Sequence, residues 1–299
     1  MTATPAVLFE NVEKNYRHFK LDLDRLELPK GQVMGMIGPN GAGKSTTIRI
    51  LMGLVHQDRG SVQVLGCAMP QAQIAAKRDI GFVSEDMRLY ARADLRWHMD
   101  YIASIYPNWD EPYAKSLMSS FELNASQQLK GFSHGQRVKA HLLLVLARRP
   151  KLLVLDEPTT GLDPVARYEV LGELMEVLAD EERTILFSSH NTHDVEQLSD
   201  HITFIDHGRV IESCDKETFL DNWCRFRLEV PTGKSLPQLP DTVVMKESGH
   251  LQVVTTSRFN ASMTETFKGA GITVHAVERM TLEEIFVACV LKSRRGENP

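Results

Sequence analysis

The sequence predicts an α/β fold with a parallel sheet, and three observations carry that prediction. A glycine-rich loop at 38–45 stands between an apolar run at 33–37 and a segment at 45–54 with apolar residues on one side. A second apolar run, 152–156, leads into two acids, and a third, 184–189, leads into a histidine. Such runs are typical of strands buried on both faces of a parallel sheet, and these sheets bind ligands beyond the carboxyl ends of their strands.

The loop fits the phosphate-binding pattern G-x-x-x-x-G-K-[ST]. Glycines let the backbone wrap closely around a triphosphate, and the N–H groups at the start of the following helix favour negative charge. Lys44 can reach the β- and γ-phosphates, and the Ser45 hydroxyl can bind Mg²⁺. The alternative is an ordinary glycine-rich turn, which the strand before the loop and the helix after it disfavour.

Acids and a histidine follow the next two expected strands. Asp156 is placed to hold Mg²⁺, directly or through water, and Glu157 to polarise the attacking water. An Asp-Glu pair after an apolar run is common, so this interpretation depends on the phosphate loop upstream. His190 and His193 could in principle bind a metal, but no third ligand stands at a suitable spacing. A histidine at a strand end beside a γ-phosphate is the preferred interpretation of His190.

Two helix starts also carry candidate binding residues. Ser133 and Gln136 form a capping-box pattern, and Asp163 with Pro164 form an N-cap followed by the first helical residue. Both patterns fit well-capped helices with no further role. The helix start at Ser133, rich in free N–H groups, could equally meet a phosphate, and the residues do not say whose.

Composition limits the classes of function. The chain has 299 residues and a formal net charge of −5, which argues against binding nucleic acid by phosphate neutralisation. No apolar run approaches the length of about 20 residues that a transmembrane helix needs, and residues 1–5 lack the features of a signal peptide. The four cysteines are widely spaced, which suits a reducing compartment and indicates neither a zinc site nor a disulfide framework.

Taken together, the motifs resemble those of the ATP-binding cassette (ABC) ATPases, in the family's order, over residues 7 to about 220. The loop resembles the Walker A motif, 152–157 resembles Walker B with its catalytic glutamate, and 132–136 (Phe-Ser-His-Gly-Gln) is similar to the signature motif L-S-G-G-Q. Residues 161–163 resemble the D-loop, and His190 the switch histidine.

The resemblance implies a role for each matched residue. Catalytic roles fall to Lys44, Glu85, Glu157 and His190. Nucleotide contacts fall to Tyr16, which would stack on adenine, and to Gly38, Pro39, Asn40, Gly41, Ala42, Gly43, Lys44, Ser45 and Thr46. Ser133, His134, Gly135, Gln136 and Asp163 would act in trans on the ATP of a second cassette. Ser45, Glu85 and Asp156 would hold the metal.

Two positions depart from the family's pattern. Glu85 stands where the Q-loop usually carries glutamine, so it adds a negative charge beside the γ-phosphate while still able to bind Mg²⁺. His134 stands where the signature usually has glycine; its backbone N–H remains, but the side chain needs room and could titrate near neutral pH.

The resemblance also predicts the domain organisation. Residues 1–221 are expected to form the cassette, a P-loop NTPase fold with a RecA-like α/β core, an antiparallel β subdomain and a helical subdomain at about 86–150. In that subdomain Trp97, Met99, Ile102 and Ile105 would form an apolar face. Residues 222–299 are expected to form a small α+β domain of order β-β-β-α-β-α. It resembles the C-terminal extension of bacterial ABC-2-type exporter ATPases, with a generic small domain as the alternative.

The function that the resemblance implies is an ATP-hydrolysing subunit that uses ATP and Mg²⁺ to energise a membrane transporter, most simply an exporter, through ATP-driven dimerisation. The partners would be a second cassette, in a homodimer or heterodimer, and separate permease subunits that hold the chain at the inner, cytoplasmic face of the membrane; nucleic acid is not an expected partner. The rivals are a soluble ABC protein acting on ribosomes or DNA, and a nucleotide-sensing regulator with weak hydrolysis.

Overall fold

The computed structural model describes residues 4–178, 183–237, 239, 241–248 and 250–296, and these form two compact units, Met1–Ser213 and Cys214–Pro299. The cassette-and-extension boundary expected at 221/222 falls at the end of helix α8 (Lys216–Asn222) and stays a prediction. Among the described residues, no helix combines the length and the apolar character that crossing a membrane requires.

The first unit is built around a six-stranded sheet in the order β10-β9-β3-β8-β7-β6. These strands are β10 (Arg209–Asp215), β9 (His201–Asp206), β3 (Val33–Ile37), β8 (Thr184–Ser189), β7 (Leu152–Asp156) and β6 (Ile80–Ser84). From β9 to β6 all neighbours run parallel. Every residue of β3, β7 and β8 is buried, as their apolar sequences require of strands covered on both faces. The predicted α/β fold class is confirmed.

An antiparallel sheet adjoins this core, with strands in the order β2-β1-β4-β5. They are β2 (Phe19–Leu28), β1 (Val7–Tyr16), β4 (Arg59–Val64) and β5 (Cys67–Met69). Helix α1 (Lys44–Leu51) buries Ile48 and Leu51 in one apolar cluster with Leu21 of β2 and Met34 of β3. This shared cluster fixes the start of α1, and with it the phosphate loop, against both sheets.

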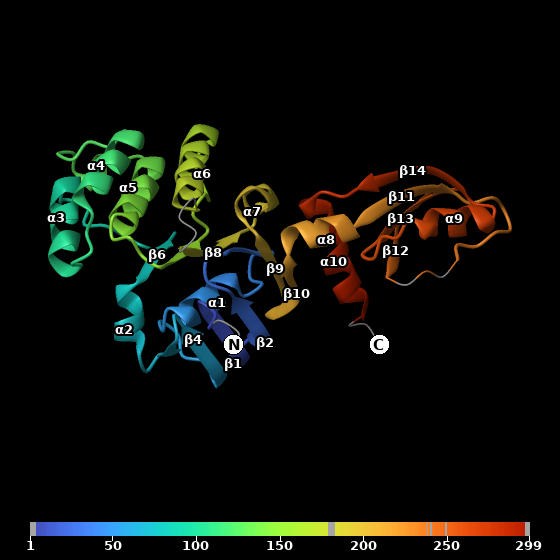
Figure 1. The fold of residues 1–299 in the computed structure, drawn as a ribbon, viewed down its shortest axis with the longest axis horizontal. Coiled ribbons are helices and arrows are strands. Elements are labelled where there is room, and N and C mark those ends of the chain that lie inside the picture. The colour runs from blue at the N-terminus through green and yellow to red at the C-terminus, as the bar shows by residue number, and fades with distance from the viewer. Residues whose placement is uncertain (1–3, 179–182, 238, 240, 249, 297–299) are drawn as a thin grey trace. The chain divides into compact units, whose positions relative to one another are not determined.

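The helices after β6 gather into a group of their own. They are α3 (Leu95–Ile105), α4 (Glu111–Ser120), the short 3₁₀ turn η1 (Leu129–Gly131) and α5 (His134–Leu146), and Figure 1 shows α3, α4 and α5 side by side. Of the apolar face expected on α3, Met99 is buried, while the Trp97 and Ile105 side chains are largely exposed. The remaining helices of this unit are α2 (Gln73–Arg78), α6 (Pro164–Leu178) and α7 (Thr192–Leu198).

The second unit follows the expected order β-β-β-α-β-α after α8. Its sheet, ordered β12-β13-β11-β14, consists of β11 (Cys224–Glu229), β12 (Thr242–Ser248), β13 (Leu251–Thr256) and β14 (Thr273–Arg279), with helices α9 (Ser262–Gly269) and α10 (Leu282–Gly296). Phe226, Val254 and Phe267 lie in its own apolar core. Thr281 and Glu284 form the predicted capping box at the start of α10.

Candidate nucleotide-binding and hydrolysis site

The phosphate loop leaves β3 and enters α1 through glycines, and a larger residue at these positions would either clash with a neighbour or strain the backbone. A Cβ at Gly38 would lie 2.3 Å from the Ile205 carbonyl oxygen. Gly41 and Gly43 have φ angles of 81° and 115°, in the left-handed region that favours glycine. The backbone therefore forms an open cradle that ends at the N-terminus of α1, where the N–H groups are free to meet an anion.

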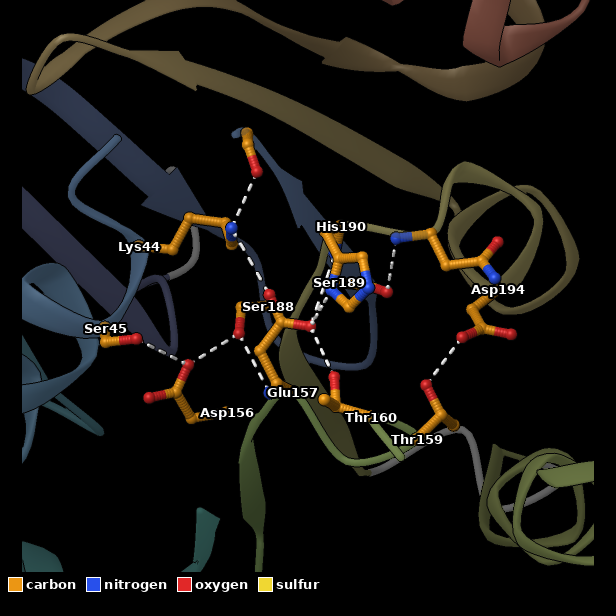
Figure 2. Close-up of polar contacts among 12 residues, drawn as sticks. Lys44, Ser45, Asp156, Glu157, Thr159, Thr160, Ser188, Ser189, His190 and Asp194 are labelled. Carbon is orange, nitrogen blue, oxygen red and sulfur yellow. Dashed lines mark hydrogen bonds and ion pairs between the residues drawn. The ribbon is translucent and has the colours of Figure 1, made fainter. Parts of the chain in front are cut away.

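Lys44 is buried in this cradle and bonded to the chain itself. Its Nζ donates to the carbonyl oxygens of Gly38 at 2.6 Å and Pro39 at 3.4 Å. It also forms an ion pair with Oε1 of Glu157, at 3.2 Å; Figure 2 draws this contact as a dashed line. An ammonium group held by two carbonyls and one carboxylate is positioned for an anionic ligand to replace some of these oxygens.

A second chain of contacts connects α1, β7 and β8. The Ser45 hydroxyl donates to Asp156 Oδ1 at 3.1 Å, and the Ser188 hydroxyl donates to the same oxygen at 2.7 Å (Figure 2). Asp156 ends β7 and is buried. Carboxylate and hydroxyl oxygens are the ligands that Mg²⁺ accepts, so this pair fits a magnesium ion next to the cradle.

Glu157 follows directly in a left-handed conformation, with φ 53°, which is uncommon for a residue other than glycine and is frequent at functional sites. Its Oε2 accepts from His190 Nδ1 at 2.7 Å and from the Thr160 hydroxyl at 3.0 Å. Burial raises the pKa of Glu157, but the His190 hydrogen bond and the Lys44 charge outweigh it, so the pKa lies below its usual value. Glu157 is therefore a carboxylate near neutral pH.

Lys44, Ser45, Glu157 and His190 line one cleft of about 680 Å³ above the phosphate loop, whereas Asp156 and Ser188 are not among its lining residues. The cleft brings together, from the predicted residues, Pro39, Asn40, Gly41, Ala42, Gly43, Lys44, Ser45, Thr46, Glu85, Glu157 and His190. Glu85 reaches it because it directly follows β6, one strand beyond β7 in the sheet. The edge of the sheet thus collects residues from four strand ends, as the sequence predicts.

The cleft also contains four residues that were not predicted from the sequence: His18, Phe19, Thr160 and His207. Phe19 begins β2 directly across the hairpin from Tyr16, the residue expected to stack on adenine. Tyr16 does not line the cleft; its side chain is exposed and its ring centroid lies 6.2 Å from that of Phe19. One feature of the sequence indicated a role for Phe19: it is an aromatic residue next to the hairpin turn.

The signature residues do not line this cleft: none of residues 133–136 is among its lining residues. Ser133 is the N-cap of α5 and forms the full capping box with Gln136. A Cβ at Gly135 would lie 3.2 Å from Ala166 Cβ, so α5 approaches the start of α6 closely here. Ser133 is exposed and does not line the cleft at the chain's own phosphate loop.

Asp163 caps α6, as predicted. Its Oδ1 accepts from the backbone N–H groups of Val165 and Ala166, each at 3.0 Å. The Ala166 N–H is the main cause of the lowered pKa of Asp163. The capping role is therefore present in the single chain, beside any role that Asp163 has toward a second cassette.

Comparison with known proteins places these features in one family. The ABC transporter family model matches residues 21–160, a span that includes the phosphate loop, the signature and both strand-end acids. The Nod factor export ATP-binding protein I of Cupriavidus metallidurans is 32% identical over 246 residues, covering 80% of this chain and 81% of that protein. The daunorubicin resistance ATP-binding protein DrrA3 of Streptomyces coeruleorubidus is 29% identical over 311 residues and covers 98% of both chains.

Among solved structures, one described as the ATP-binding subunit of an ABC transporter superposes with a TM-score of 0.65 at 26% identity, covering 73% of this chain and 92% of that one. Sequence, fold and the motifs of the cleft agree. The chain belongs to the family of ABC transporter ATP-binding proteins.

Proposed function

We propose that this chain is the ATP-hydrolysing subunit of an exporter and that it works as a two-site dimer beneath separate permease subunits. The observation that carries the proposal is the convergence of Lys44, Asp156 and Glu157 at one edge of the sheet, next to an open glycine cradle. A cation, a metal-binding acid and a water-orienting acid are the groups that phosphoryl transfer to water needs.

The triphosphate of ATP would lie along residues 38–46, with its charge facing the N-terminus of α1. Lys44 would exchange the Gly38 and Pro39 carbonyls for phosphate oxygens, which form stronger, charge-assisted hydrogen bonds. Because Lys44 is already held within the cradle, little side-chain freedom is lost on binding.

Ser45 and Asp156 would hold Mg²⁺, with Glu85 as a further oxygen ligand from the neighbouring strand end. The ion would supply positive charge to the phosphate oxygens as negative charge develops on them. The contacts among Ser45, Asp156 and Ser188 keep the metal-binding carboxylate in place before the ion arrives.

Glu157 would orient the attacking water. Its lowered pKa keeps the carboxylate ionised, and His190 with Thr160 fixes the direction of Oε2. When phosphate takes Lys44 away from Oε1, that oxygen becomes free to accept a hydrogen bond from water.

The signature would complete the site in trans. Ser133 and the N-terminus of α5 do not line the chain's own cleft, which supports a contact with the γ-phosphate on a second cassette. Two chains arranged head to tail would then close two nucleotides between them, either as a homodimer or with a related cassette.

The names of similar proteins support the exporter role. One is named for Nod factor export and another for daunorubicin resistance, and the latter aligns over the C-terminal unit as well. We infer that the chain acts at the inner face of the membrane through permease subunits. Copurification of a tagged chain from native membranes tests this. A multi-spanning membrane protein in the eluate supports the exporter role, and its absence, with ATPase activity intact, favours a soluble ABC protein that acts outside a transporter.

Mixing two disabled chains tests the shared site. Ser133→Asp keeps a good helix cap but opposes phosphate with a negative charge, and Ser133→Asn is the uncharged control. Lys44→Ala disables the phosphate loop. In the mixed dimer one interface combines both defects and the other has neither, so part of the activity should return although each variant alone is inactive. No recovery at any mixing ratio would contradict the trans role of Ser133.

A further inference from the structure

His134, the unusual residue of the signature, contacts the catalytic segment of its own chain. Its Nε2 lies 3.0 Å from the Thr160 carbonyl oxygen. Since a carbonyl only accepts, Nε2 carries the proton and donates. The ring also lies against Gly161, where a Cβ would stand 3.2 Å from Nε2 and where φ is 72°. A glycine at position 161 is therefore what allows the imidazole to approach.

Thr160 continues the connection to the site of hydrolysis. Its hydroxyl donates to Glu157 Oε2 at 3.0 Å, a contact drawn in Figure 2. Its backbone N–H donates to the Glu157 carbonyl at 3.3 Å. Residues 157–160 thus form a tight turn that His134 holds from one side. On the other side Thr159 donates to the buried Asp194 at 2.7 Å.

The signature helix is also joined to α6, the helix that follows this turn. Lys139 of α5 forms an ion pair with Glu169 of α6 at 2.5 Å, and Lys139 is buried. Together with the close approach of Gly135 to Ala166, this contact joins the first two turns of α5 to those of α6. The N-terminal part of α5 is therefore packed against the start of the helix that follows the turn carrying Glu157.

We propose that His134 is a positioning residue that links the signature helix of one chain to that chain's own catalytic carboxylate. The proposal rests on the proposed dimer. There, Ser133 next to His134 faces the ATP of the partner chain, while Glu157 serves the chain's own ATP. The path from His134 through Thr160 to Glu157 then lets nucleotide at one site set the carboxylate geometry at the other.

Mixed dimers separate this role from a local one. The working interface in a mixture of Ser133→Asp and Lys44→Ala chains takes Glu157 from the first chain and Ser133 from the second. His134→Phe keeps a flat ring of similar size and removes the donor. It is placed either on the first chain, in cis to the working Glu157, or on the second, beside the working Ser133.

Placed in cis to Glu157, His134→Phe should lower kcat by about 3- to 10-fold, the effect expected from loss of one orienting hydrogen bond. The KM for ATP should stay the same, because the phosphate loop is untouched. Placed beside the working Ser133, where the backbone N–H of residue 134 is kept for the partner's phosphate, it should lower kcat by a smaller factor than in cis. His134→Gln, whose amide can donate from a similar position, should restore kcat in the cis arrangement.

A loss that appears only when the substitution stands beside the working Ser133 would overturn the proposal, since His134 would then be a trans contact or a support for α5. Equal loss in both places, or none in either, would overturn it as well. Failure of the parent mixture to recover activity would instead contradict the dimer itself. Thr160→Val provides a second variant. Combined with His134→Phe in cis, it should lower kcat no further than either change alone. If the two losses in kcat were additive, they would contradict a shared path from His134 to Glu157.

Discussion

The two units hold their charged clusters in different ways. In the first unit Lys44 and Glu157 are 5% and 14% exposed, and Glu157 has an unusual backbone conformation. In the second unit Arg225 pairs with Glu278 and Glu284, and these three side chains are 25%, 32% and 38% exposed. Arg225 donates two hydrogen bonds to Glu278 Oε2, at 3.0 and 2.6 Å, and one to Glu284 at 2.6 Å.

The difference lies in what a ligand could replace. Arg225 is held by carboxylates across strands β11 and β14 and the start of α10, so its contacts stabilise the fold around it. Lys44 is held largely by carbonyl oxygens of a loop that a phosphate could displace. Burial, backbone strain and exchangeable partners together indicate a functional site, whereas an ion pair by itself does not.

Glu157→Gln should have the largest effect on activity. The amide keeps the shape but loses the negative charge that orients water, so turnover should fall by about 100-fold or more while ATP binding persists. With ATP the variant should accumulate as a dimer, measured by light scattering. Glu283→Gln, an exposed position on α10, is the control. Turnover near that of the unmodified chain would reject the catalytic assignment.

Lys44→Ala should act on binding instead. Ligand at 100 times its dissociation constant stabilises a protein by about 2.7 kcal/mol, and the variant should lose most of this gain because the cation is gone. Thermal unfolding with and without ATP measures it, with Lys115→Ala, an exposed lysine of α4, as the control. Undiminished stabilisation by ATP in the Lys44 variant would show that the phosphates bind elsewhere.

Much of this site could be predicted from the sequence because most of its residues stand in short, contiguous motifs. The phosphate loop, Asp156 with Glu157, and His190 each follow a short apolar strand, and a parallel sheet brings strand ends to one edge. Phe19 lines the cleft only because the β1–β2 hairpin lies next to the phosphate loop. The contact of His134 with Thr160 joins residues 26 positions apart in the sequence. Neither follows from periodicity, since both depend on tertiary packing.

Substitution of Tyr16 should have a smaller effect, on the affinity for ATP, and it compares two aromatic residues of the first unit. If adenine stacks on this ring, Tyr16→Ala should raise the dissociation constant of ATP about tenfold, because base stacking is worth about 1–3 kcal/mol. Tyr16→Phe should be mild. Phe19→Leu is the competing test, because Phe19 lines the cleft and Tyr16 does not. A loss of affinity in Phe19→Leu with none in Tyr16→Ala would assign the stacking surface to Phe19.

The smallest expected effect concerns the ion pairs of the second unit. The hydrogen bond from Arg225 lowers the pKa of Glu278 below its usual value of 4.5. A carboxyl group with a lowered folded-state pKa adds stability above its unfolded pKa, and this is lost as the pH falls through the folded pKa. Arg225→Met should therefore lower the unfolding temperature at pH 7 by a few degrees and approach the unmodified chain at pH 3.

Fluorescence of Trp223, buried in the second unit, can follow this transition once the other two tryptophans, Trp97 and Trp109, are replaced by phenylalanine. Lys268→Met, which breaks the exposed pair with Glu265, is the matched control and should show a smaller difference at either pH, because its partners are more exposed. If the Arg225→Met chain unfolded at the same temperature as the Lys268→Met control at pH 7, the ion pairs of Arg225 would add no more stability than an exposed surface pair. The contrast between the two units would then lie in the catalytic cluster alone.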